Sequence, residues 1–277
     1  MVIMINSIDL AHFITNRFGL PVLSETKQVP EGQKLVIRPS EVPQTIGFSV
    51  EFVIGWRSLE AKFVPGRFAA ELVEAMRTAD LDKKAAFKVF AEAAQAKSAQ
   101  IHMTVSGKLV DPVAPENWPN GWGSFELLMR KSAIVLDPND AAGERETIYP
   151  WAARFFGMIL ALLPLESTEQ PPLTGEEEGA VYEAKVRRYE RSRINRAACI
   201  EIHGLYCVVC HLLFSERYGE IGESFIHVHH VVPVSMMGGS YVVNPATDLV
   251  PVCPNCHAML HSRTPPLSVD QLKTLLA

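Results

Sequence analysis

The sequence has no cysteine before Cys199, no excess of basic residues and no apolar run of membrane-spanning length. The formal net charge is −5, which excludes a protein that binds nucleic acid through an overall positive charge. The apolar stretch at residues 151–163 is interrupted by Arg154 and bounded by Pro150 and Pro164, and it is too short to span a bilayer. We therefore expect no membrane partner.

The first residues also lack the basic n-region and the small-residue cleavage site of a secretory signal peptide. We therefore expect a cytoplasmic protein. Thiols stay reduced in that compartment, so cysteines grouped in pairs favour metal binding over disulfide formation.

Composition divides the chain into two parts. Residues 1–180 carry 17 Lys and Arg against 23 Asp and Glu. Residues 181–277 carry 9 against 8, and they hold seven of the nine histidines and all five cysteines. We predict an N-terminal domain over residues 1–165, a proline-bearing acidic linker over 166–180 and a C-terminal domain over 181–277.

The N-terminal residues carry both helical and strand patterns and predict an α+β domain. Ser7 is expected to cap the first helix and Gly19 to end it. The domain has no Gly-rich phosphate loop and no carboxylate pair with lysine at nuclease-like spacing, so its sequence predicts no function. The expected helices span residues 8–18, 68–77, 82–96 and 148–163, and the expected strands span 34–38, 45–54, 100–105 and 125–135.

Two tryptophans, Trp118 and Trp122, lie in a proline-rich stretch of this domain. Exposed tryptophans can stack on nucleobases. Tryptophan is more often buried, and we favour a role as core or loop anchors.

A candidate recognition element precedes the cysteines, in a helix predicted over residues 181–203. Its cations either form a solvated face or contact phosphates, and both interpretations stay open. The six cations in twelve residues are Lys185, Arg187, Arg188, Arg191, Arg193 and Arg196.

Two CxxC pairs, Cys207 with Cys210 and Cys253 with Cys256, have the spacing of a four-thiolate zinc site. Each pair lies on a tight turn, so both thiolates can face one ion. Four thiolates leave no open position for water, and such a zinc ion would be structural. The fifth cysteine, Cys199, is predicted to be a small buried side chain.

The histidines form a separate set. His229 and His230 are adjacent on a predicted strand and point to opposite faces, whereas His257 and His261 share one face of a predicted helix. His229, His257 and His261 are therefore predicted to converge on one divalent cation, which leaves His230 to accept a proton. Alternatively, some histidines support the zinc site, which is our preferred interpretation for two others, His211 and His227.

These motifs resemble an HNH endonuclease domain of the ββα-metal class. The resemblance rests on Cys207-x-x-Cys210, His229-His230-x-x-Pro233, Asp248-Leu and Cys253-Pro-Asn-Cys256-His257-x-x-x-His261, and it covers about residues 185–263. The greatest likeness is to the HNH domain of restriction enzymes for modified cytosine. The resemblance implies a β-hairpin followed by a helix, with strands near residues 225–230 and 249–252 and the helix near 255–262.

The resemblance also implies roles. His230 corresponds to the general base, and His229, His257 and His261 correspond to ligands of a catalytic Mg²⁺, Mn²⁺ or Ni²⁺. Asp248 stands where the family has its middle asparagine, and it either orients His230 or ligates the cation. The four cysteines correspond to a structural Zn²⁺ site.

The leading hypothesis is a divalent-metal-dependent endonuclease that cuts double-stranded DNA, with the N-terminal domain choosing the target. The resemblance implies a role in restriction or phage defence, and a homodimer for a double-strand cut because HNH domains often make a single nick. One alternative is a non-catalytic, zinc-stabilised DNA-binding protein. Another is an RNA-directed or toxin-like nuclease.

Overall fold

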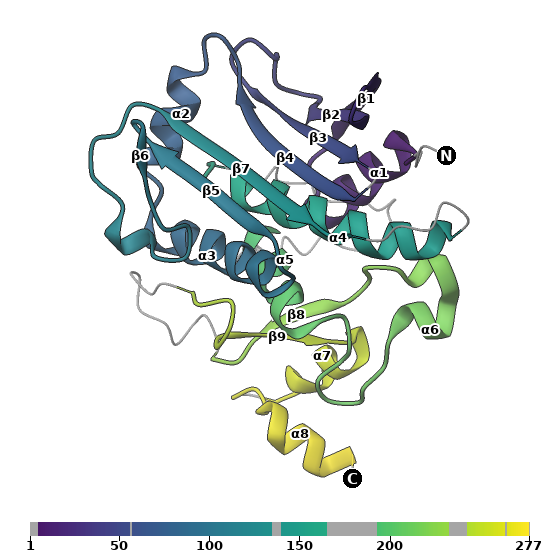
Figure 1. The fold of residues 1–277 in the computed structure, drawn as a ribbon. Helices are drawn as coiled ribbons and strands as arrows, with labels where there is room; N and C mark the ends of the chain where they lie inside the picture. Colours follow the sequence, from purple (N-terminus) through teal and green to yellow (C-terminus); the bar gives the residue numbers. More distant parts are fainter. Residues whose placement is uncertain are drawn as a thin grey trace, which may run out of the picture.

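A computed structural model of the chain describes residues 5–55, 57–134, 140–164, 193–232, 243–263 and 265–276 (Figure 1). Its N-terminal part is built on a seven-stranded antiparallel sheet with the strand order β1-β2-β3-β4-β7-β5-β6. The strands are β1 (Val22–Val29), β2 (Gly32–Pro39), β3 (Phe48–Gly55), β4 (Ser58–Pro65), β5 (Gln100–Val105), β6 (Lys108–Leu109) and β7 (Phe125–Ser132).

Helices cover one face of this sheet. The long helix α4 lies against the strands, and α1 and α3 flank it (Figure 1). The N-terminal helices are α1 (Ser7–Phe18), α2 (Ala70–Arg77), α3 (Leu81–Ala96), the short 3-10 helix η1 (Pro115–Asn117) and α4 (Ala141–Ala161). Among the described residues, no helix is both long and apolar enough to cross a membrane.

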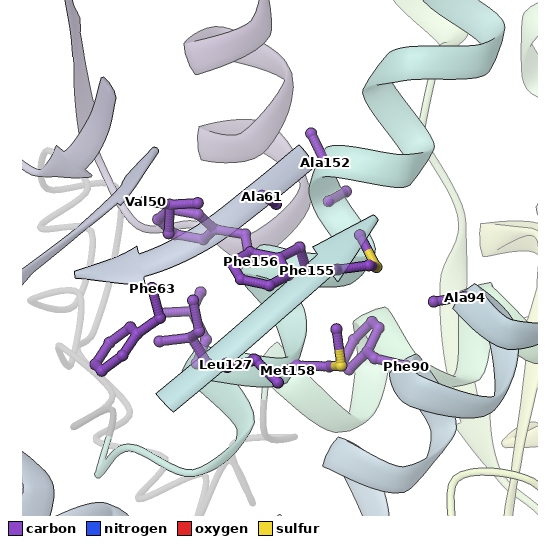
Figure 2. Packing of buried hydrophobic residues seen from close by; sticks show 14 of the residues in the cluster. Val50, Ala61, Phe63, Phe90, Ala94, Leu127, Ala152, Phe155, Phe156 and Met158 are labelled. Atoms are coloured by element: carbon purple, nitrogen blue, oxygen red, sulfur yellow. The ribbon is translucent and has the colours of Figure 1, made fainter. Parts of the chain in front are cut away.

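The core lies between the sheet and these helices because side chains alternate along each strand. In β4, Leu59, Ala61 and Phe63 are buried, while Lys62 between them is exposed. Figure 2 shows this packing, in which Phe155 and Phe156 of α4 lie against the strands. Gly157 lets α4 approach α3 closely, since a Cβ there would stand 2.8 Å from the ring of Phe90.

Several predicted elements are confirmed. The first helix ends at Gly19, which has a φ of 63°, although its cap is Asn6 rather than Ser7 because the Asn6 side chain accepts from the Ile8 N–H. The strand at 100–105 is confirmed. Trp118 and Trp122 are buried, and the Trp118 indole donates to the Asp111 carbonyl at 2.8 Å, so they are anchors as favoured.

Other expectations were incomplete. Strands β1, β4 and β6 were not predicted, and β1 carries mostly exposed polar side chains, as an edge strand can. The last N-terminal helix was expected to begin near residue 148, but α4 begins at Ala141 and continues through Pro150. Asp140 starts it early by accepting from the Gly143 N–H at 2.9 Å. Pro150 has no N–H, so α4 lacks one backbone hydrogen bond there.

The C-terminal part is a smaller unit with its own core. A two-stranded antiparallel sheet pairs β8 with β9, and Figure 1 shows both strands on the other side of α5 from the large sheet. Its elements are α5 (Arg193–His203), α6 (Phe214–Tyr218), the 3-10 helix η2 (Gly219–Gly222), β8 (His227–His230), β9 (Leu249–Val252), α7 (Pro254–Leu260) and α8 (Val269–Leu276).

Helix α5 belongs to both cores. Ile194, Ala197 and Ala198 are buried in the N-terminal core, whereas Cys199 and Ile200 are buried in the C-terminal core. Residues 165–192, which include the predicted linker and the first part of the predicted helix over 181–203, lie outside the described residues. The described end of that helix therefore joins the two parts.

Candidate active site and metal centres

The hairpin of β8 and β9 positions the first histidines. His229 pairs with Val250 and His230 with Leu249, and the Val231 N–H donates to the Asp248 carbonyl at 2.8 Å beyond the last pair. Because side chains alternate along a strand, His227 and His229 share one face and His230 lies on the other.

Helix α7 brings the remaining histidines to β8. Its N-cap is Cys253, whose sulfur accepts from the Cys256 N–H at 3.3 Å, and Pro254 suits the first helical turn. His261 is the C-cap residue, and its N–H donates to the His257 carbonyl at 3.3 Å. Leu260, fully buried, fixes the helix against the C-terminal core.

His229, His257 and His261 converge as the sequence predicts. One ring nitrogen from each lies within 4.8 Å of the others, and the ring centroids are 5.0 to 5.4 Å apart. His229 is 5% exposed, whereas His261 lies on the surface. Three imidazoles at this spacing fit a divalent cation, and the group opens toward solvent on the His261 side.

His227 is a neighbour of this group that the sequence interpretation underestimated. Its Nδ1 lies 3.5 Å from Nδ1 of His257, within hydrogen-bonding distance. The period-2 alternation of β8, which puts His227 on the face of His229, was the signal that could have found it. His211 is exposed in the turn between Cys207 and Leu212, and its backbone N–H donates to the Cys207 carbonyl at 2.8 Å.

Asp248 is 9% exposed and stabilises the turn that leads into β9. Its Oδ2 accepts from the Asn244 N–H at 2.7 Å, and its Oδ1 accepts from the Thr247 hydroxyl at 2.9 Å. Asp248 is not a member of the three-histidine group. Its predicted roles toward His230 and the cation stay predictions.

The four cysteines also come together. Their sulfurs all lie within 4.8 Å of one another, and Cys210 Sγ lies 3.7 Å from Cys253 Sγ. In a tetrahedral ZnS₄ site with bonds of about 2.3 Å, the sulfurs are about 3.8 Å apart. The donor set and its spacing therefore fit zinc.

Backbone groups favour the thiolate form of Cys207, whereas burial raises the pKa of Cys210 and Cys256. Burial raises the pKa of Cys207, but backbone hydrogen bonds from Cys210, Cys253 and Val209 outweigh burial, and the pKa lies below its ordinary value. Cys199, by contrast, is fully buried away from the cluster, and burial raises the pKa of its thiol to about 12. Cys199 is thus a small buried side chain, as predicted.

The predicted recognition helix is described only in part, since Lys185, Arg187, Arg188 and Arg191 lie outside the described residues. Arg193 donates to the Gly19 carbonyl at 2.6 Å. Arg196 donates to the carbonyls of Ser224 and Ile226 at 3.2 and 2.9 Å, so it holds the segment just before β8. The predicted phosphate contacts of these residues stay predictions.

A partly buried ion cluster joins the two parts of the chain, and sequence reasoning missed it. The carboxylate of Glu201 in α5 accepts from Arg17 of α1 at 2.8 Å and from Arg154 of α4 at 2.6 Å. Arg145 and Glu223 form a second, exposed ion pair across the same boundary at 3.2 Å. No local signal reveals such pairs, because the partners are far apart in the sequence.

Comparison with known proteins assigns one segment. Residues 207–263 match the family model of the HNH endonuclease. The matched segment contains both cysteine pairs, the β8–β9 hairpin and α7. The residues that form the two metal-binding groups therefore all lie inside the matched segment. Neither the curated proteins nor the solved structures gave a match to the chain. The finer likeness to restriction enzymes for modified cytosine stays a prediction.

Proposed function

We propose that the chain is a divalent-metal-dependent DNA endonuclease whose active site is the three-histidine group together with His230. The observation that carries this proposal is the convergence of His229, His257 and His261 next to a strand that also carries His230, within a segment matching the HNH endonuclease family. Mg²⁺, Mn²⁺ and Ni²⁺ are the candidate cations.

The three-histidine group and His230 have different roles in the proposed hydrolysis. A divalent cation held by the three imidazoles would stabilise the negative charge that develops on the phosphate and the leaving oxygen. His230, half-buried on the opposite face of β8, accepts a proton from the water that attacks phosphorus, and the bond from phosphorus to the leaving oxygen then breaks. Asp248 fixes the start of β9, opposite His230.

The four-cysteine cluster has a structural role in this proposal. Cys253 is both a member of the cluster and the N-cap of α7, which carries His257. Zinc bound there would fix the start of α7 and hence the position of His257. The N-terminal sheet domain would choose the target, and a role in restriction or phage defence follows if that target is foreign DNA.

The test is plasmid cleavage by the full chain across Mg²⁺, Mn²⁺ and Ni²⁺, on modified and unmodified plasmid. His230→Ala should abolish cleavage while zinc content and melting temperature are retained, and His12→Ala, which changes an exposed histidine of α1, should cleave normally. A difference between the two plasmids would indicate that the sheet domain senses the modification.

Other results would select another function. DNA binding without cleavage under every cation would favour a non-catalytic zinc-stabilised DNA-binding protein. Preferential cleavage of RNA would favour the RNA-directed nuclease. Nicked plasmid without linear product, combined with a monomer in sedimentation, would contradict the expected homodimer.

A further inference from the structure

Three aromatic side chains lead up to the histidine group. Tyr218 and Phe214 of α6 stack with ring centroids 5.6 Å apart and planes 18° apart, and Phe214 meets Phe225 edge-on at 4.8 Å. We call these three residues the aromatic row. Phe225 lies 6.1 Å from His227, whose ring is 5.3 Å from that of His257.

The two ends of the aromatic row are open to solvent. Tyr218 is 51% exposed and Phe225 is 47% exposed. Phe214 between them packs against the C-terminal core and anchors the row. The row therefore presents exposed aromatic rings beside the candidate active site, and exposed apolar surface that is contiguous is where proteins bind partners.

The charges around the row argue against a phosphate clamp. Glu216, Glu220 and Glu223 outnumber Arg217 in this segment, and Glu223 is already paired with Arg145. The glutamates repel a phosphate at the row itself, so the row fits an uncharged flat group. The face of a nucleobase is such a group, because every base can stack on an aromatic ring whatever its sequence.

We propose that the aromatic row is a stacking platform for an unstacked nucleobase of the substrate, next to the phosphate that is cut. This inference rests on the proposed endonuclease function and specifies its substrate class. Bases inside a duplex stack on one another and cannot reach the row. The chain therefore acts on DNA that has an unpaired or extruded base near the scissile bond.

The distances fit this placement. Two ring contacts, of 6.1 and 5.3 Å, connect Phe225 to His257. Nucleotides along one strand of a duplex advance about 3.4 Å each. A base on Phe225 would therefore lie within about three nucleotides of a phosphate at the histidines.

Binding is measured with the zinc-loaded full chain carrying His230→Ala, so that cleavage does not remove the probe. The probes are a 20-base-pair duplex with a three-base bubble, the same duplex fully paired, and the single strand, each with one 2-aminopurine. The bubble and the single strand should bind more tightly than the paired duplex. Tyr218→Leu and Phe225→Leu should each weaken bubble binding by roughly tenfold, as loss of one base stack does.

Matched variants separate stacking from folding. Tyr206→Leu changes another tyrosine of the same unit, 50% exposed and outside the row, and it should bind the bubble like the parent. Tyr218→Trp keeps a flat ring and should retain binding. Zinc content and melting temperature are measured for every variant.

Each outcome decides one proposal. Equal binding of bubble and paired duplex, or unchanged binding by both Leu variants, overturns the platform. The platform is also overturned if the parent protein binds none of the probes. The same holds if Tyr218→Leu and Phe225→Leu change only the self-association of the protein. Cleavage by the wild type with row variants unaffected leaves the endonuclease standing without the platform. Row-dependent bubble binding without wild-type cleavage under any cation supports base stacking on the row, but it contradicts the endonuclease and with it the placement of the row beside a cut phosphate.

Discussion

Replacing Glu201 by glutamine tests whether the partly buried ion cluster holds the two parts of the chain together. The Glu201 side chain is 8% exposed, and those of Arg17 and Arg154 are 12% and 13% exposed. Burial lowers the pKa of Arg17 and Glu201 raises it. Without the carboxylate, two guanidinium groups with little exposure to water would face each other uncompensated.

The expected loss is large. Removing one partner of a buried ion pair destabilises a protein by about 3–5 kcal/mol, because the remaining charge is buried without compensation. Glu223→Gln is the matched control, since its ion pair with Arg145 crosses the same boundary but is 48% and 45% exposed. An exposed pair contributes about 0–1 kcal/mol.

The assay is urea unfolding followed by two probes. All four tryptophans lie in residues 1–165, so their fluorescence reports the sheet domain. Cobalt substituted for zinc at the four cysteines reports the C-terminal unit through its thiolate absorbance. In the wild type the two transitions should coincide, and in Glu201→Gln the cobalt transition should shift to lower urea. A free energy of unfolding within 1 kcal/mol of the Glu223→Gln value would refute the reasoning.

Three other predictions concern single contacts. Gly157→Ala places a Cβ 2.8 Å from the buried Phe90 ring and should destabilise by about 1–3 kcal/mol in thermal unfolding; Gly123→Ala, with open space at its Cβ, should change little. Metal analysis should find no bound zinc in Cys253→Ser and one zinc per chain in Cys199→Ala. Equal zinc content in the two variants would contradict the four-cysteine site. Arg196→Met removes two hydrogen bonds to the segment before β8 and should lower stability by about 1.5–3 kcal/mol, while a urea midpoint equal to that of the wild type would show that these bonds contribute nothing.

The sequence predicts the cysteine and histidine segments of the C-terminal unit well because their signals are local, whereas α6 and α8 were not predicted. The i, i+4 spacing of His257 and His261 and the two CxxC turns each fix a geometry within a few residues. The pairing of β8 with β9 then brings these histidines and cysteines together, and the HNH resemblance predicted that pairing.

The N-terminal domain was less predictable, for physical reasons. β1 carries few buried side chains, because an edge strand is held mainly by backbone hydrogen bonds to β2. The alternation of Leu59, Ala61 and Phe63 could have predicted β4. The contact between Arg17 and Glu201 could not be predicted, since 184 residues separate them.

The shared helix α5 has a mechanical consequence. Its eleven residues form a rod of about 16 Å, with one side fixed in the large core and the other in the small one. Cys207 lies four residues after the end of α5, and Arg196 of α5 donates hydrogen bonds to the backbone just before β8. If the N-terminal sheet tilted α5, the four-cysteine cluster and β8 with its histidines would therefore move together.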